Sequence, residues 1–330
     1  MSENILVTGA TGFLGKQFLP RLLSRDVNVY ALTRPNGKTS NNKKISDPNL
    51  VYIRGDVTQP GLTNEDLPEI NEVWNLAGLT DFYEKARPKL EDINIGGVEN
   101  IVEFAKKRGA KLFHVSTAYV AGKTKGRVLE DELIESPGFR NPYEETKYKG
   151  EEIVRASDIP YVIMRPSIIV GDSQTGEAES DKMVYGVIKL YGVLDKLMKR
   201  NGQSEAVGIL GQRDATKNII PVDNVADAMI AIKDNGQEGK TYHITNPEPT
   251  YVGIMHDAIT ESLGLDKLVI SESPCNGKWR QRVDRFLDVY KDYMTMSDPV
   301  FDQSNMFSVY NGFTKLTKEK QKQLYQRWRE

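Results

Sequence analysis

Hydrophobic positions along the chain follow two alternating patterns. Short apolar runs rich in β-branched and aromatic residues, typical of buried parallel strands, lie at residues 4–8, 27–33, 50–54, 72–76, 111–116, 161–165 and 241–245. Between them, apolar residues recur at the spacing of amphipathic helices, as in 13–24 and 93–108. This alternation is typical of a parallel sheet covered by helices on both faces. We therefore predict a doubly wound α/β fold.

The strict alternation stops after Asp172, which suggests a second, smaller lobe. We predict one domain from residues 1–172 with 218–246, and a non-contiguous substrate-binding lobe from 173–217 with 247–330. Residues 35–47, rich in Asn, Lys, Ser and Gly, predict a surface loop. Within the lobe, residues 183–199 have an apolar stripe at helical spacing, and it either lines an acyl channel or is plain core: Val184, Val187, Ile188, Tyr191, Leu194, Leu197 and Met198.

Three glycines follow the first predicted strand at intervals of three residues, and a helix follows them. Such a turn lets the backbone bend tightly, approach a pyrophosphate and pack against the sheet, with the phosphates at the helix N-terminus. It indicates a Rossmann-type dinucleotide site, although a glycine triplet also occurs in ordinary turns. The predicted cofactor-binding residues of this turn are Gly9, Thr11, Gly12, Phe13, Leu14 and Gly15.

The end of the second predicted strand indicates which dinucleotide binds. Enzymes that use NAD place a carboxylate there for the ribose 2′-hydroxyl, whereas this chain has Thr33 and Arg34. A guanidinium pairs well with a 2′-phosphate, and Lys16 adds a second positive charge, so we predict NADPH as the cofactor. The alternative is that both cations are ordinary surface residues in contact with water. After the third strand, Asp56 and Val57 are expected near the adenine. Further cofactor contacts are expected from Leu76, Ala77 and Gly78, after the fourth strand.

A tyrosine and a lysine four residues apart predict proton chemistry. Tyr143 has an ordinary pKa near 10, and the ammonium of Lys147, one helical turn away, is expected to lower that pKa. Both side chains are also expected to contact the cofactor. A hydroxyl for the substrate oxygen comes from Ser116 or Thr117, at the end of the fifth strand. A Tyr-x-x-x-Lys pair alone is common on surface helices.

Composition narrows the range of partners. A net charge of −2 gives no positive electrostatic field that would attract nucleic acid, so we expect no nucleic-acid partner. No apolar run reaches the length of a transmembrane helix, and the N-terminus has no signal peptide, so we expect a soluble, cytoplasmic protein. The single cysteine, Cys275, excludes an intramolecular disulfide. Metal-ligand spacing is absent among His114, His243 and His256, so no metal is expected.

Several motifs in order resemble the extended short-chain dehydrogenases/reductases. They are TGATGFLG, GDV at 55–57, NLAG, HVSTAYVAG, NPYEETK and RPSI at 165–168. Within that family, STAYVAG and RPSIIVGDSQTGE are most similar to the thioester-reductase and fatty acyl-CoA reductase branch, called male-sterility-like. The resemblance selects Thr117 as the catalytic hydroxyl with Tyr143 and Lys147, gives Asn94 a structural or water-relay role, and places Pro166 and Ile168 at the cofactor.

The resemblance implies an NADPH-dependent reductase that converts an acyl thioester to an aldehyde or alcohol by direct hydride transfer. Cys275 lies far from the motifs, which argues against a covalent acyl-cysteine. With no preceding adenylation or carrier segment, the substrate is expected as a free acyl-CoA or on a separate carrier protein. A ketone reductase, a nucleotide-sugar epimerase or dehydratase, and a non-catalytic NADP-binding protein remain alternatives. A homodimer, and docking through the basic segments 278–285 and 318–329, are left open.

Overall fold

The computed structural model describes residues 2–34, 45–273, 283 and 287–328. Most of the predicted surface loop at 35–47 therefore lies outside the described residues. So do Cys275 and nearly all of the basic segment 278–285.

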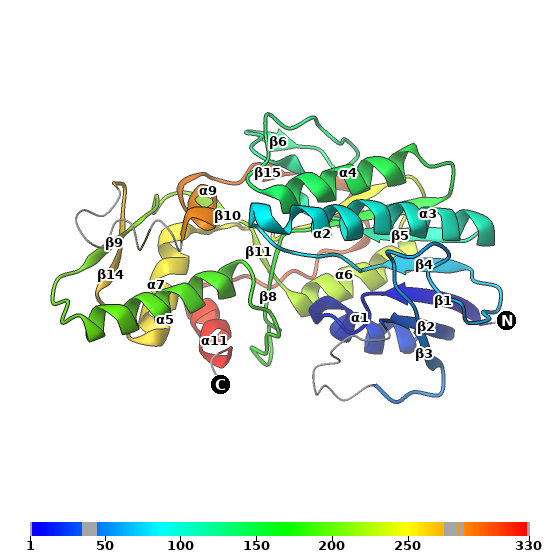
Figure 1. The fold of residues 1–330 in the computed structure, drawn as a ribbon, viewed down its shortest axis with the longest axis horizontal. Helices are drawn as coiled ribbons and strands as arrows, with labels where there is room; N and C mark the ends of the chain where they lie inside the picture. The colour runs from blue at the N-terminus through cyan, green and yellow to red at the C-terminus, as the bar shows by residue number, and fades with distance from the viewer. Residues whose placement is uncertain (1, 35–44, 274–282, 284–286, 329–330) are drawn as a thin grey trace. The chain divides into compact units, whose positions relative to one another are not determined.

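Seven parallel strands form the central sheet, in the order β12-β7-β5-β4-β1-β2-β3 (Figure 1). Each lies within two residues, at either end, of a run predicted from the apolar pattern. Together with the covering helices they confirm the doubly wound fold class. The strands are β1 (Glu3–Thr8), β2 (Val27–Thr33), β3 (Leu50–Arg54), β4 (Glu72–Asn75), β5 (Lys111–Val115), β7 (Tyr161–Pro166) and β12 (Thr241–Ile244).

Helices cover both faces of this sheet (Figure 1). One face holds α3 (Gly97–Arg108) and α4 (Pro142–Ala156), whose apolar residues join a core with alternate strand positions such as Leu6 and Val73. The other face holds α1 (Phe13–Leu23) and α6 (Val222–Asn235). On that face the rings of Trp74 and Phe113 stack with centroids 4.1 Å apart, and Phe18 packs against Trp74 in a tilted arrangement at 4.6 Å.

The order in which strands are added to the sheet reverses between β1 and β4. From β1 the chain first builds outward through β2 and β3, then returns to add β4, β5, β7 and β12 on the other side. Ligands of open α/β sheets bind at such a switch point, outside the carboxyl ends of the strands. The register places Thr8 opposite Asn75, and Asn75 opposite His114. Polar residues at three strand ends therefore meet at the switch point.

Contacts divide the chain into two compact units. The first comprises residues 1–166, 225–244 and 301–312, and the second comprises 167–224, 245–300 and 313–330. The predicted domains placed 167–172, 218–224 and 245–246 in the first domain and 301–312 in the lobe. The predicted domain boundaries stay a prediction.

The second unit is built from short strand pairs and helices. Its helices include α5 (Val184–Arg200), α7 (Val252–Leu263), α9 (Lys291–Thr295) and α11 (Lys318–Arg327), and α11 packs against α7. Its strand pairs are β8 (Ile168–Val170) with β11 (Ile219–Pro221), β9 (Val207–Leu210) with β14 (Leu268–Ser271), and β10 (Thr216–Lys217) with β13 (Thr250–Tyr251). Within the described ranges, no helix combines the length and apolarity needed to cross a membrane.

Candidate active site

The glycine turn between β1 and α1 brings backbone segments closer than side chains would allow. A Cβ on Gly9 would lie 2.6 Å from the carbonyl carbon of Leu76, and a Cβ on Gly15 would clash with the carbonyl oxygen of Gly9. Gly9 also has a φ of +69°, which L side chains rarely adopt. Both positions therefore require glycine.

This turn ends in a helix N-terminus suited to an anion. Gly12 precedes α1, its N–H donates to the carbonyl oxygen of Gly9 at 3.0 Å, and it has no side chain to cap the helix. The first turn of α1 contains no acidic residue. Thr11 and Gly12 are exposed, whereas Phe13 and Leu14 are half-buried. Backbone N–H groups and the helix dipole therefore fit a pyrophosphate here, and the cradle around Gly9 would be filled by any larger residue.

A buried chain of hydrogen bonds links the ends of β1, β4 and β5. The N–H of Ala77 donates to Thr8 Oγ1 at 3.2 Å, and Thr8 Oγ1 donates to Asn75 Oδ1 at 2.8 Å. Asn75 Nδ2 lies 3.1 Å from His114 Nδ1, which must accept because an amide nitrogen only donates. Burial, and then the charge of Lys147, lower the pKa of His114 to about 3, so it stays neutral. The chain fixes the predicted NLAG segment against the glycine turn.

Asn94 connects this segment to α4. Its side chain accepts from the N–H of Leu79 at 2.8 Å and donates to the carbonyl oxygen of Leu79 at 3.0 Å and to Thr146 Oγ1 at 3.1 Å. Asn94 lies in a π-helical turn, Asp92–Gly96, a geometry frequent at functional sites. Next to it, a Cβ on Gly78 would lie 3.9 Å from Lys147 Nζ. The structure thus places Gly78 close to Lys147.

Helix α4 presents three ionisable side chains on one face, at intervals of four residues: Tyr143, Lys147 and Glu151. The N-terminus of this helix is capped: Asn141 Oδ1 accepts from the N–H of Glu144 at 3.1 Å, and a proline occupies the first turn. Lys147 is buried and donates to the carbonyl oxygen of Val115 at 2.8 Å.

Two threonine hydroxyls converge on the phenol of Tyr143. Its side chain hydrogen-bonds with Thr117, from the end of β5, and with Thr80, from the loop after β4. Thr117 Oγ1 also donates to the carbonyl oxygen of Pro166 at 3.3 Å. The ring of Phe82 meets the Tyr143 ring edge-on, with centroids 6.0 Å apart. Sequence reasoning missed Thr80; its only signal was a hydroxyl two residues after the NLAG glycine.

The structure corrects the predicted effect of Lys147 on Tyr143. Burial raises the pKa of Tyr143, the hydrogen bonds with Thr117 and Thr80 offset this only in part, and Lys147 is not among the groups that lower it. Instead, burial lowers the pKa of Lys147 itself to about 8, against an opposing attraction from Glu151. The expectation failed because a spacing of four residues does not reveal how deeply both side chains are buried.

A buried charge cluster lies behind Lys147. Glu151 Oε1 accepts from Arg165 Nη2 at 2.6 Å and from Arg155 Nε at 2.9 Å. Burial alone would raise the pKa of Glu151, but the two guanidinium groups lower it to about 2. Glu130 accepts from the N–H of His243 at 2.8 Å, and burial raises its pKa to about 7. None of these charges stood out in the sequence.

The residues predicted to contact the 2′-phosphate and the adenine lie at the ends of β2 and β3. Arg34 is exposed at the end of β2, whereas the hydroxyl of Thr33 donates to the carbonyl oxygen of Ile53 at 3.0 Å. Asp56 Oδ1 accepts from the N–H of Thr58 at 3.0 Å, so this carboxylate stabilises the turn in which it lies.

Val57 is held next to α3. Its carbonyl oxygen accepts from Asn100 Nδ2 at 2.9 Å, and a Cβ on Gly97 would lie 3.1 Å from its side chain. The last predicted cofactor contact, Ile168, belongs to the second unit.

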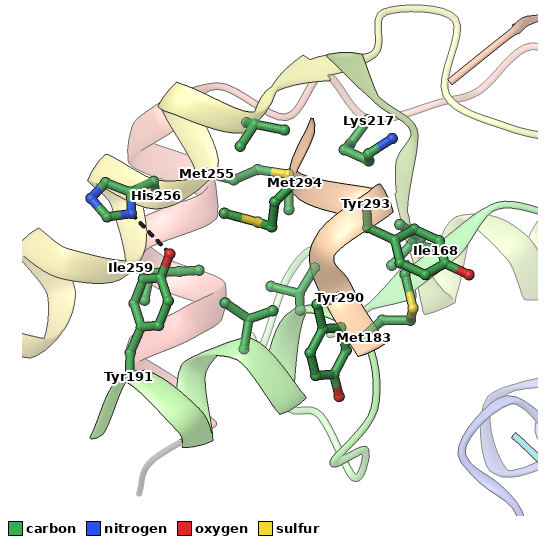
Figure 2. A pocket seen from close by; sticks show the side chains of 13 residues that line it. Ile168, Met183, Tyr191, Lys217, Met255, His256, Ile259, Tyr290, Tyr293 and Met294 are labelled. Atoms are coloured by element: carbon green, nitrogen blue, oxygen red, sulfur yellow. Dashed lines mark hydrogen bonds between the residues drawn. The ribbon is translucent and has the colours of Figure 1, made fainter. Parts of the chain in front are cut away.

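An apolar pocket lies within the second unit, and Ile168 is part of its wall (Figure 2). Its cavity volume is about 30 Å³, and its other lining residues are Met183, Val184, Val187, Tyr191, Lys217, Val252, Met255, His256, Ile259, Tyr290, Tyr293 and Met294. Of the predicted apolar stripe on α5, three residues line it, Val184, Val187 and Tyr191. Over the described ranges, no group of three His, Cys, Asp or Glu residues is arranged to hold a metal ion.

Comparison with known proteins identifies the family. Residues 7–229, about two thirds of the chain, match the NAD-binding family described as "Male sterility protein". The chain belongs to this family. It is thus an extended short-chain dehydrogenase/reductase of the male-sterility branch, as the motifs predicted, and the family indicates an oxidoreductase.

Similar proteins within and beyond this branch differ in activity. Fatty acyl-CoA reductase 1 of Arabidopsis thaliana is 26% identical, over 78% of this chain and 69% of the relative. A putative UDP-glucose 4-epimerase of Methanocaldococcus jannaschii is 25% identical, over 83% of this chain and 87% of the relative. The terminal R domain of the myxalamid PKS-NRPS pathway has the same fold, with a TM-score of 0.78, 23% identity and coverage of 99% of this chain and 90% of that structure.

Proposed function

We propose that this male-sterility-branch protein is an NADPH-dependent reductase that converts an acyl thioester to an aldehyde or an alcohol. The observation that carries the proposal is the hydrogen bonding of Tyr143 with Thr117 and Thr80. Tyr143 lies on the same helix as Lys147, whose Nζ lies close to Gly78 at the switch point of the sheet. A sheet that only bound a nucleotide would have no need of a phenol held by two hydroxyls.

The cofactor is held by the glycine turn and the strand ends. Gly9, Gly12 and the N-terminus of α1 accommodate the pyrophosphate, and Arg34 pairs with the 2′-phosphate. When bound, the reduced nicotinamide supplies a hydride to the substrate carbonyl carbon. Lys147 Nζ, close to Gly78, would hydrogen-bond the nicotinamide ribose.

The chain's own residues stabilise and protonate the substrate oxygen. Thr117 and Tyr143 donate hydrogen bonds to the thioester carbonyl oxygen as negative charge develops on it. Tyr143 then transfers its proton, and the hemithioacetal breaks its C–S bond to give aldehyde and free thiol. The raised pKa of Tyr143 suits this direction, because the phenol stays protonated at neutral pH.

The choice of a thioester rests on the similarity to fatty acyl-CoA reductase 1 and on the fold shared with an R domain. The thioester would be an acyl-CoA or an acyl group on a separate carrier protein. The similarity to a putative UDP-glucose 4-epimerase favours a second candidate, a nucleotide-sugar epimerase or dehydratase that uses the same Tyr143 and Lys147.

A paired assay on the purified protein separates the two. NADPH or NADH is offered with a panel of acyl-CoAs, and cofactor oxidation and free thiol are followed together. We expect both signals with NADPH, both lost in Tyr143→Phe. UDP-glucose conversion without net cofactor oxidation, combined with no thiol from any acyl-CoA, would establish the epimerase alternative instead.

The cofactor choice is tested separately through Arg34. Arg34→Ala should weaken NADPH binding by about 1.5–3 kcal/mol, the worth of a charged hydrogen bond, and spare NADH. Equal weakening of both dinucleotides would remove Arg34 from cofactor selection.

A further inference from the structure

The side-chain amide of Asn94 is fully engaged inside the protein. Its Oδ1 accepts from the N–H of Leu79 at 2.8 Å, and its Nδ2 donates to the carbonyl oxygen of Leu79 at 3.0 Å and to Thr146 Oγ1 at 3.1 Å. An amide nitrogen has two protons, so both are used. Asn94 is only 1% exposed. Of the structural and water-relay roles that the family resemblance implies, this pairing disfavours the relay, because no donor remains for a water molecule.

The main-chain carbonyl of Asn94 is enclosed as well. Asn94 lies in the π-helical turn Asp92–Gly96, which leads into α3 and packs against α4. A Cβ on Gly150 of α4 would lie 2.4 Å from the carbonyl oxygen of Asn94, so only a glycine allows the two backbones to approach this closely. Thr146 lies one turn before Gly150 on α4. The close approach therefore brings Asn94 within hydrogen-bonding reach of Thr146.

Thr146 connects Asn94 to the backbone of Tyr143. Thr146 Oγ1 donates to the main-chain carbonyl oxygen of Tyr143 at 3.1 Å. A hydroxyl has one proton and a carbonyl only accepts, so Thr146 Oγ1 must accept from Asn94 Nδ2. The side chain of Thr146 is buried, which shields both bonds from water. One hydroxyl thus joins Asn94 to the residue that carries the phenol.

The other contacts of Asn94 fix the loop after β4. Because the N–H and the carbonyl of Leu79 both bond to one amide, the backbone at Leu79 is held in a single orientation. The residues that follow bring two side chains to the phenol. Thr80 hydrogen-bonds with Tyr143, and the ring of Phe82 meets the Tyr143 ring edge-on, with centroids 6.0 Å apart. Asn94 therefore supports the surroundings of the phenol as well as its backbone.

We propose that Asn94 and Thr146 are positioning residues that hold the phenol of Tyr143 from two sides, and that Asn94 does not relay protons. Asn94 acts through the loop at Leu79 and through Thr146, and Thr146 acts through the backbone of Tyr143. The effect of this positioning on the rate of reduction rests on the proposed function. Its effect on the phenol itself does not.

Thr146→Val tests the proposal, because it removes the hydroxyl and keeps the size and the β-branch. A displaced phenol should lower kcat for acyl-CoA reduction about tenfold, while the Kd of NADPH from fluorescence titration stays within twofold. Thr146→Ser keeps the hydroxyl and should restore kcat to within twofold of the wild-type value.

Thr260→Val, on α7, is the matched control. The hydroxyl of Thr260 also donates to a main-chain carbonyl of its own helix, that of His256 at 3.0 Å. Its removal should leave kcat within twofold. Circular dichroism checks that each variant folds, and Thr146→Ala, with its high helix propensity, replaces Thr146→Val if the valine variant does not fold.

A second measurement reports on the phenol without turnover. The protein is produced with tyrosine labelled with carbon-13 at Cζ, and the Tyr143 resonance is identified by its loss in Tyr143→Phe. The shift of this carbon depends on hydrogen bonds to the phenol oxygen. At neutral pH, Thr146→Val should move the resonance toward its position in Thr80→Val. Thr146→Ser and Thr260→Val should leave it in place.

Several results would overturn the proposal. One is an unchanged kcat in Thr146→Val, as expected if Asn94 relays protons through the N–H that this variant frees. Others are a resonance that stays in place in Thr146→Val, a rate that serine does not restore, and a loss of NADPH affinity large enough to explain the slower reaction.

Failure of the proposed function would look different. If the wild-type protein reduces no thioester but the Tyr143 resonance moves as predicted, the positioning roles stand and the proposed function is wrong. If thioesters are reduced and the resonance does not move in Thr146→Val, the positioning roles are wrong and the proposed function stands.

Discussion

The candidate active site and the apolar pocket of the second unit differ in how their polar groups are paired. In the first unit, Thr117 and Thr80 hydrogen-bond with the phenol of Tyr143, and burial raises the pKa of Tyr143 and lowers that of Lys147. In the second unit, His256 and Lys217 are paired away from the space they line. Under the proposed function, the first region serves proton transfer, whereas the polar groups that line the second are already paired within the protein. Substitutions should therefore change rate and pH dependence in the first, and stability in the second.

Tyr143→Phe is expected to have the largest effect, and to act on the candidate active site alone. Removal of a positioned proton donor typically costs about 10²–10⁴ in rate, so kcat for acyl-CoA reduction should fall by that factor. NADPH affinity by fluorescence titration should stay within twofold. Turnover that survives would remove the phenol from the mechanism.

Breaking one buried ion pair in each unit sharpens the comparison. Glu151→Gln leaves the Arg165 guanidinium uncompensated, and Asp298→Asn does the same to Lys217. Each should cost about 3–5 kcal/mol of unfolding free energy in urea. Only Glu151→Gln should also lower the pKa of Lys147, because Glu151 is the charge that raises it.

An equal shift of the alkaline limb of kcat/KM in both variants would contradict this expectation, because it would show that Glu151 does not set the pKa of Lys147.

The pH profile tests Lys147 alone. Burial lowers its pKa to about 8, so its ammonium is charged below that pH and lost above it. kcat/KM, which reports the free enzyme, should therefore fall about tenfold per unit above pH 8. Lys147→Arg keeps the charge and should abolish this limb at whatever rate remains; a limb unchanged in that variant would assign it to another group.

The smallest effect is expected at Thr80. Thr80→Val removes one of two hydrogen bonds that lower the pKa of Tyr143, so that pKa should rise further. At about 1 kcal/mol for a neutral hydrogen bond, kcat should fall about fivefold. Thr80→Ser should restore the rate. A serine variant as slow as the valine variant would show that the methyl group, not the hydroxyl, matters.

The sequence predicted those parts of the site that depend on local backbone rules. Apolar runs and glycine spacing located the seven strands and the turn at Gly9. It did not reveal the hydrogen bonds of Thr80, or the pairing of Glu151 with Arg165, because these join segments far apart in the chain. Burial, which decided the pKa of Tyr143 and Lys147, is likewise a property of the folded core. The same limit hid the pocket wall: α5 showed a stripe, but α7 and α9 gave no sign of facing it.

Direct hydride transfer to a thioester is the central claim, and isotope transfer tests it most directly. The protein is incubated with an acyl-CoA and NADPH that contains deuterium at both C4 positions, and the aldehyde is trapped and analysed by mass spectrometry. The account predicts one deuterium on the former carbonyl carbon of each aldehyde and one free thiol for each aldehyde formed. An aldehyde without deuterium, or an intact thioester beside an unchanged deuterated cofactor, would contradict it.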